Sequence, residues 1–166
     1  MKDLFFCLVF GSVSIIIQCC VLGKIFPMEF KPDLTLLVVV WVGLKGDYVS
    51  GLFSAFFLGI IEDLLSGAPL GLFSFIYLVA YMFSAFVSVN FDVDQLGLSW
   101  LVAIVTSFIS FCLVFLARWL GGQVMFELPI IEFILIKTIM TSLCLIVVKP
   151  LLDNSWRGYS RLIGAT

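Results

Sequence analysis

Two adjacent carboxylates, Glu62 and Asp63, are the side chains of this sequence that suggest acid–base chemistry or metal binding. Neighbouring residues on a helix point about 100° apart, so these two cannot easily share a proton or a metal ion. The chain has no histidine, which is the commonest general base and metal ligand. Its five cysteines show no C-x-x-C spacing. We therefore predict that the protein is not an enzyme and holds no cofactor or metal.

Lys137 is the second chemically notable side chain, because it lies well inside an apolar run. It stands roughly 14 Å from the start of that run on a helix, near the middle of a bilayer. A lysine at that depth costs about 2.5–3.5 kcal/mol, so it should face other helices and have a partner. Glu132 is about 140° away around the same helix, so we expect the partner on another helix, or in backbone carbonyls or water. Lys137 is thus a buried polar candidate, either for contact with a substrate or for holding helices together.

The elements that position these residues are set by composition. Hydrophobic residues make up 63% of the 166 residues and charged residues only 12%, against about 45–50% and about 25% in soluble domains. This excludes an ordinary cytosolic globule, and it excludes disorder, which needs low hydrophobicity and high net charge. The net charge of −2 offers no basic surface for nucleic acid. We predict an all-α integral membrane protein with one transmembrane domain over residues 1–166 and no cleaved signal peptide.

Uncharged apolar runs predict a bundle of six transmembrane helices. The expected spans are residues 4–23, 33–44, 48–65, 68–89, 97–120 and 128–148, the last ending before Lys149 and Pro150. The second span reaches only about 17 Å, so it must be short, tilted or shielded by its neighbours. A re-entrant hairpin over residues 33–65 is the alternative.

Lysine and arginine positions predict the direction of insertion, since cytoplasmic loops carry more of them. Six spans place five cations on the side of both termini and three on the other side. The first set is Lys2, Lys45, Lys149, Arg157 and Arg161, and the second is Lys24, Lys31 and Arg118. We therefore predict that both termini are cytoplasmic.

Small residues follow one face of the third expected span. Gly51, Ala55 and Gly59 are four residues apart, and the row continues to Asp63. Such a row lets another helix approach closely in a membrane, where no hydrophobic effect drives helices together. A corner follows, in which a glycine can end one helix and a proline can begin the next. The helix-packing or partner-binding candidates are Asp33, Gly51, Ala55, Gly59, Asp63, Gly67, Pro69 and Gly71, although this corner could also serve packing alone.

Asp33 follows Pro32 at the start of the second expected span. Its side-chain oxygen can accept a hydrogen bond from a free backbone N–H of the first helical turn. We expect this capping role for Asp33.

Together, these segments resemble the bacterial rod shape-determining MreD family. That family shows a PDL-like helix start and a G-L-x-x-D-x-x-x-G-x-P-L-G-like corner. Here Pro32-Asp33-Leu34 matches the start, and Ile60 replaces the usual leucine of the corner. The corner positions that match are Gly59, Asp63, Gly67, Pro69, Leu70 and Gly71. The second half of the chain matches in hydropathy alone.

The resemblance implies a non-enzymatic, multi-pass protein of the bacterial inner membrane that serves the cell-elongation and peptidoglycan-synthesis machinery. Its implied partners are the lipid bilayer and MreC, with MreB, RodA and the elongation-specific transpeptidase bound directly or indirectly. The implied fold resembles the substrate-binding subunit of energy-coupling-factor transporters.

That fold leaves a vitamin-binding transporter subunit as the alternative function. Such subunits dock through an alanine-x-x-x-alanine patch on their first helix, and residues 4–23 contain no alanine. The scaffold is therefore the preferred interpretation.

Overall fold

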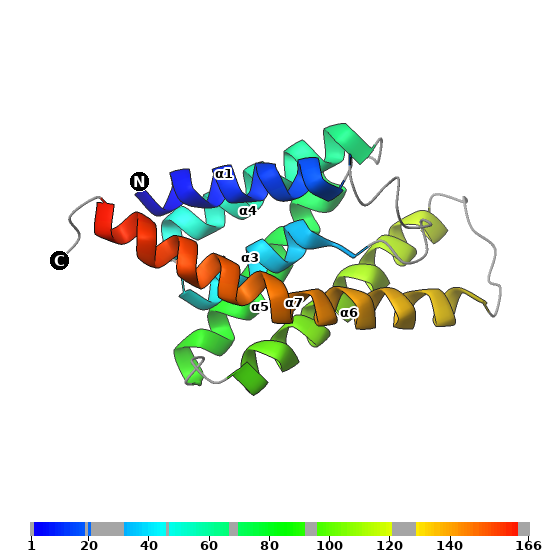
Figure 1. Cartoon of the computed structure of the whole chain (residues 1–166). Coiled ribbons are helices and arrows are strands. Elements are labelled where there is room, and N and C mark those ends of the chain that lie inside the picture. Colours follow the sequence, from blue (N-terminus) through cyan, green and yellow to red (C-terminus); the bar gives the residue numbers. More distant parts are fainter. Residues whose placement is uncertain are drawn as a thin grey trace.

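The computed structural model describes residues 2–18, 20, 32–45, 47–66, 70–91, 96–120 and 129–162. These residues form six helices: α1 (Lys2–Ile17), α3 (Leu34–Lys45), α4 (Tyr48–Ser66), α5 (Leu72–Asn90), α6 (Leu96–Leu120) and α7 (Pro129–Leu162) (Figure 1). Four segments are long and apolar enough to cross a membrane, namely Tyr48–Ser66, Leu72–Asn90, Gly97–Ala117 and Leu135–Tyr159. α1 and α3 are shorter apolar helices. The predicted all-α class is confirmed.

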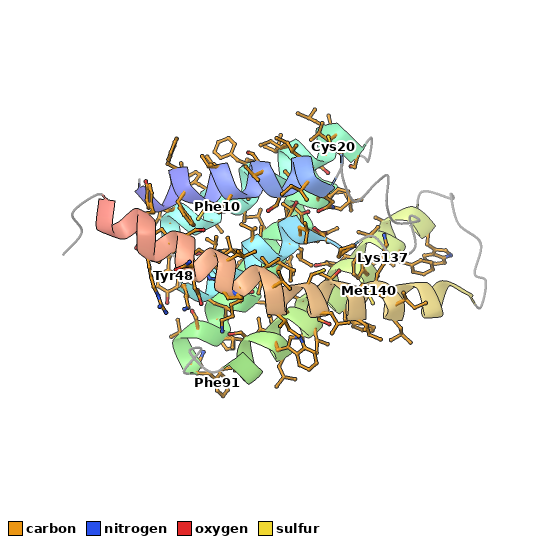
Figure 2. The ribbon with its side chains drawn as sticks, in the orientation of Figure 1. Phe10, Cys20, Tyr48, Phe91, Lys137 and Met140 are labelled. Atoms are coloured by element: carbon orange, nitrogen blue, oxygen red, sulfur yellow. The ribbon has the colours of Figure 1, made fainter. Side chains whose placement is uncertain are left out.

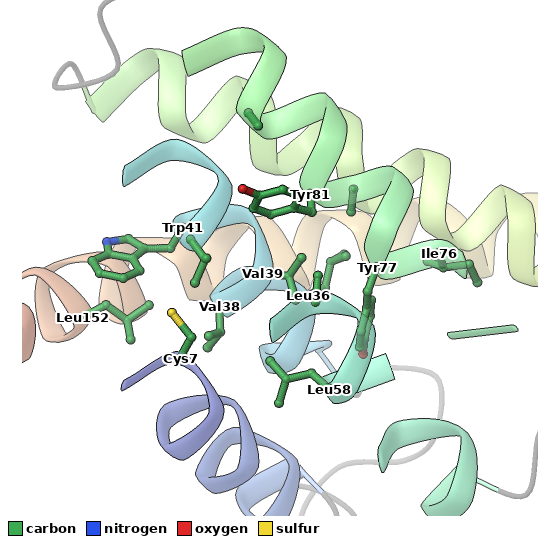
Figure 3. Packing of buried hydrophobic residues seen from close by; sticks show 14 of the residues in the cluster. Cys7, Leu36, Val38, Val39, Trp41, Leu58, Ile76, Tyr77, Tyr81 and Leu152 are labelled. Atoms are coloured by element: carbon green, nitrogen blue, oxygen red, sulfur yellow. The ribbon is translucent and has the colours of Figure 1, made fainter. Parts of the chain in front are cut away.

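The short helix α3 lies at the centre of the bundle. It contacts each of the other five described helices, and ten of its twelve residues are buried. Figure 3 shows Val38 and Val39 of α3 among side chains of α1, α4 and α5, including Leu58 and Tyr77. Its length of about 18 Å does not have to match the bilayer thickness, because its neighbours shield it. Shielding is one of the three arrangements that the sequence allowed.

The distribution of side chains differs from that in a soluble protein. The described interior holds many polar side chains, whereas large apolar side chains cover the outside (Figure 2). On α4 the exposed residues include Leu52, Phe53, Phe56 and Phe57, while Ser50, Ser54, Glu62 and Asp63 are buried. An apolar exterior suits lipid, and polar side chains between helices can bond to one another there.

Helix α7 extends beyond the expected end of the sixth span. The sixth span was expected to end before Lys149 and Pro150, but the helix continues through Pro150 to Leu162. A proline inside a helix costs about 3 kcal/mol or more. Leu152 is buried beyond the proline, and Trp156 packs against the same core. Close packing of these side chains against the other helices compensates for the hydrogen bond that the proline removes.

Candidate functional site

Asp63 is the residue of the predicted corner with the most hydrogen bonds. Its Oδ1 accepts from the backbone N–H of Phe73 at 2.8 Å, and its Oδ2 accepts from Gly71 N at 2.9 Å. Ser74 donates to Oδ2 from its hydroxyl at 3.0 Å and its backbone N–H at 3.4 Å. The first N–H groups of a helix have no partner within the helix and favour negative charge. Asp63 on α4 therefore caps the N-terminus of α5.

Gly71, at the start of α5, has a φ of +96°. This is the left-handed region, which glycine adopts without steric cost. The conformation turns the N–H groups of the first α5 turn toward Asp63. Gly67 and Pro69 of the same predicted corner lie outside the described residues.

The row of small residues on α4 faces α5. A methyl group on Gly59 would stand 2.3 Å from Cα and 2.6 Å from N of Ser74, so the two backbones touch at this point. A methyl group on Gly51 would stand 2.5 Å from the ring of Tyr81. Ala55, between the two glycines, is fully buried. These three residues thus lie in a contact between two helices of this chain.

Next to the corner lies a group of polar side chains from five helices or their ends, all buried except the half-buried Asp33. We call it the polar cluster, and its members are Gln18, Asp33, Thr35, Glu62, Tyr77 and Thr141. The amide of Gln18 uses both of its ends there. Its Nε2 donates to Glu62 Oε1 at 3.3 Å, and its Oε1 accepts from Leu34 N at 3.1 Å and from the Thr35 hydroxyl at 3.4 Å. Gln18 thereby joins the end of α1 to α3 and α4.

Asp33 is the second carboxylate of the polar cluster. Its Oδ1 accepts from Leu36 N at 2.9 Å, which is the capping bond expected for this residue. The same oxygen accepts from the hydroxyl of Tyr77 on α5 at 3.3 Å. Its own backbone N–H donates to Thr141 Oγ1 on α7 at 3.2 Å. Asp33 thus connects the first turn of the central helix to two others.

Lys137 lies on α7, and its side chain reaches toward α6. Its ammonium is 5.6 Å from the ring centre of Phe111 on α6, within the range of a cation–π contact. Its side chain is half-buried. The side chain of Glu132, the residue weighed as its partner, lies outside the described residues.

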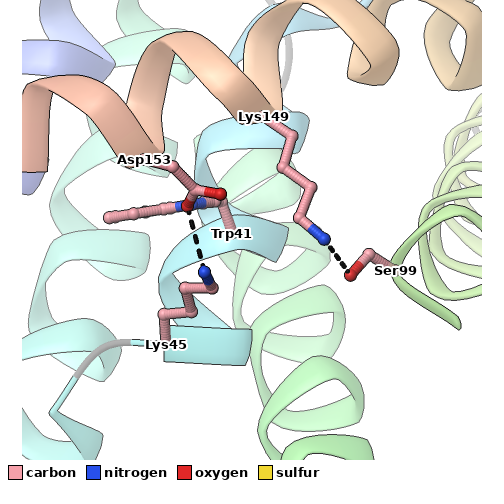
Figure 4. Close-up of polar contacts among 5 residues, drawn as sticks. All are labelled: Trp41, Lys45, Ser99, Lys149 and Asp153. Atoms are coloured by element: carbon pink, nitrogen blue, oxygen red, sulfur yellow. Dashed lines mark hydrogen bonds and ion pairs between the residues drawn. The ribbon is translucent and has the colours of Figure 1, made fainter. Parts of the chain in front are cut away.

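At the other end of α3, a group of charged and aromatic side chains connects three helices (Figure 4). Asp153 on α7 accepts from the indole N–H of Trp41 at 2.8 Å and pairs with Lys45 at 3.2 Å. Lys149, one turn earlier on α7, is buried and donates to Ser99 Oγ on α6 at 2.7 Å. We call these five residues the Asp153 group.

Glu62 and Asp63 have different partners. Glu62 accepts a hydrogen bond from Gln18 at the end of α1, whereas Asp63 accepts hydrogen bonds from the start of α5. Within the described ranges, no three His, Cys, Asp or Glu side chains gather as a metal site would require. Most bonds of the polar cluster and the Asp153 group run from one helix to another, so both groups hold helices of the bundle together.

Four residues of these two groups were not among the sequence candidates, namely Gln18, Tyr77, Thr141 and Asp153. Gln18 had a usable signal, since a lone amide in an apolar run needs a partner in lipid. Tyr77 and Thr141 had none, because single hydroxyls are ordinary in such helices. Lys149 was interpreted as a marker of a span end, whereas it lies buried inside a longer helix.

The sequence model of a family described as rod shape-determining protein MreD matches residues 2–153 of the chain. The chain belongs to the MreD family. The resemblance inferred from the sequence is confirmed, and membership implies a role in rod-shape determination. No curated protein and no solved structure is significantly similar to the chain.

Two aspartates carry much of the MreD resemblance, and the carboxylate of each accepts hydrogen bonds at the start of a helix. Asp33 caps α3 and Asp63 caps α5. Gly59 and Gly71 of the pattern allow the close approach of α4 to α5 and the turn into α5. In this MreD-family protein, these residues therefore determine how the central helices meet.

Proposed function

We propose that this MreD-family protein is a non-enzymatic scaffold of the bacterial cell-elongation machinery. It binds MreC and, directly or through other proteins, MreB, RodA and the elongation-specific transpeptidase. The observation that carries the proposal is the family match over residues 2–153. The internal hydrogen bonds support it, because the side chains of the polar cluster and the Asp153 group bond from one helix to another.

The proposed scaffold lies in the inner membrane as one bundle of six crossings, with both termini in the cytoplasm. We propose that its architecture resembles that of the substrate-binding subunits of energy-coupling-factor transporters. The exposed apolar faces of α4 to α7 support a membrane location. The polar cluster is then in the periplasmic half and the Asp153 group in the cytoplasmic half.

Co-purification from membranes tests the scaffold function. The tagged chain, extracted in mild detergent, is expected to retain MreC at a fixed ratio, and mass spectrometry identifies what accompanies it. A preparation that carries a bound vitamin and does not retain MreC would contradict the proposal and support a transporter subunit.

We propose that Asp63 and the residues around it affect partner binding indirectly, because they keep the corner between α4 and α5 in its shape. Asp63→Ala is expected to reduce MreC retention and to shorten or round the cells, because α5 loses its cap. Gly97→Ala is the matched control, since the described part of the chain places no atom within 4 Å of the added methyl group. Normal rod shape and normal MreC retention in Asp63→Ala would remove Asp63 from the functional site.

A further inference from the structure

A groove lies between the start of α1 and the end of α7. It has a volume of about 350 Å³. Its lining residues are Phe5, Phe6, Val9, Phe10, Ser155, Gly158 and Tyr159. We call this the aromatic groove, since four of these seven residues carry rings and none is charged. Phe5 is 63% exposed and Phe10, labelled in Figure 2, is half-buried, so rings remain accessible from outside.

The floor of the groove is a packed group of rings. Phe6 is buried, with its ring centre 4.3 Å from that of Phe10 and 5.3 Å from that of Tyr159. The ring of Trp156 contacts the ring of Phe6 edge to face, with their centres 5.0 Å apart. Rings held in this way keep their positions without a ligand, which lowers the entropy cost of binding.

The groove is open at Gly158. No atom of the described residues lies within 4 Å of the position that a side chain would take there. Asp153 lies about one turn earlier on α7, and Trp156 and Tyr159 lie near it on the same helix. Tryptophan, tyrosine and charged residues occur together at membrane–water interfaces. In the proposed membrane placement, the groove therefore opens at the level of the lipid headgroups.

The faces of aromatic rings carry negative electrostatic potential and attract organic cations, the more so where water is excluded. A lipid ammonium headgroup can meet these rings, and its acyl chain can follow the apolar surface of Val9.

We propose that the aromatic groove binds the ammonium headgroup of a phospholipid such as phosphatidylethanolamine. The proposal rests on the membrane placement given under Proposed function, but not on the binding of MreC. Lipid binding is measured on the purified chain alone, without MreC. A failure of this proposal is therefore distinguishable from a failure of the scaffold function.

Native mass spectrometry of the detergent-solubilised chain tests this. Phosphatidylethanolamine, phosphatidylcholine and phosphatidylglycerol with identical acyl chains are added at equal concentration. The two ammonium lipids are expected to be retained more than phosphatidylglycerol. Phe5→Leu keeps an apolar side chain but removes a ring, and it should reduce this preference about two- to five-fold. Phe53→Leu is the control, because Phe53 is an exposed ring on α4, away from the groove.

Gly158→Leu fills the groove and should abolish the preference, whereas Gly97→Leu, at an equally open position, should not. Circular dichroism and thermal unfolding verify that each variant is folded. Equal retention of the three lipids by the unmodified chain, or equal effects of Phe5→Leu and Phe53→Leu, would overturn the proposal. The proposal would also be overturned if Gly158→Leu converted a dimer of the chain into monomers while lipid retention stayed the same, because the groove would then bind a second copy.

Discussion

Buried polar side chains in this protein occur where a helix begins or where two helices meet. Asp63 accepts four hydrogen bonds from the first turn of α5, and Gln18 connects three elements with one amide. In lipid, water cannot replace such bonds, so each backbone N–H at a buried helix start needs a partner from the protein. This explains why residues of the MreD pattern are polar or small within a chain that is otherwise apolar.

At the residue scale, Asp63→Ala is expected to lower the free energy of unfolding by about 1–3 kcal/mol, because it leaves buried N–H groups of α5 without an acceptor. Thermal unfolding in detergent measures this. Glu62→Gln is the control, since it removes the neighbouring charge and keeps an oxygen that can accept from Gln18. If both variants unfold like the unmodified protein, the cap does not contribute to stability.

The capping role of Asp33 could be predicted because a cap is local: the bond joins residues three apart in the sequence. The cap by Asp63 joins residues eight to eleven apart across a turn. Its acceptor was singled out by the corner pattern, but its donors were not identified. The bond between Gln18 and Glu62 spans 44 residues, and no local pattern predicts it.

Among the elements, the contact of α4 with α5 depends on glycines at the crossing. The sequence identified the row Gly51, Ala55 and Gly59 from its four-residue spacing. It could not identify α5 as the neighbour, because a small-residue row fits any helix that approaches closely. Gly59 against Ser74 and Gly51 against Tyr81 specify the pairing in the folded chain.

Gly59→Ala is expected to lower the free energy of unfolding by about 1–3 kcal/mol, because the methyl group would overlap the backbone of Ser74, which cannot move aside without shifting α5. Gly97→Ala should leave it unchanged or raise it, since alanine is the better helix former and the position is open. The measurement is chemical or thermal unfolding of both variants side by side. A Gly59→Ala protein as stable as Gly97→Ala would contradict the close contact.

Helix α7 runs past the residues at which the sixth span was expected to end. Lys149 and Pro150 together are typical of a helix end, because lysine favours the last turn and proline interrupts the hydrogen bonds. The helix continues because Leu152 and Trp156 pack against α1 and α3 beyond it. Lys149 is kept inside by its bond to Ser99 on α6. Both contacts are long-range, so they leave no trace in the local pattern.

For the whole molecule, the proposed topology follows from the cations that lie on each side of the expected spans. Reporter fusions test it. Alkaline phosphatase, which is active only outside the cytoplasm, should be active when fused after Leu120 and inactive at Asn90 or at the full-length C-terminus. Green fluorescent protein should show the reverse pattern. An active phosphatase at the full-length C-terminus would contradict the proposed orientation.

The sequence by itself determined the all-α membrane class, the MreD family, the corner and the cap at Asp33. Hydropathy, helical spacing and short motifs are carried by neighbouring residues, so they can be recognised without knowing the fold. Tertiary structure alone decided that α3 is central, that α4 packs against α5 through its glycines, and that α7 extends past Pro150. It also assembled the polar cluster and the aromatic groove from distant segments. These features depend on which helix faces meet, and in lipid that choice depends on close packing and paired polar groups rather than on hydrophobicity.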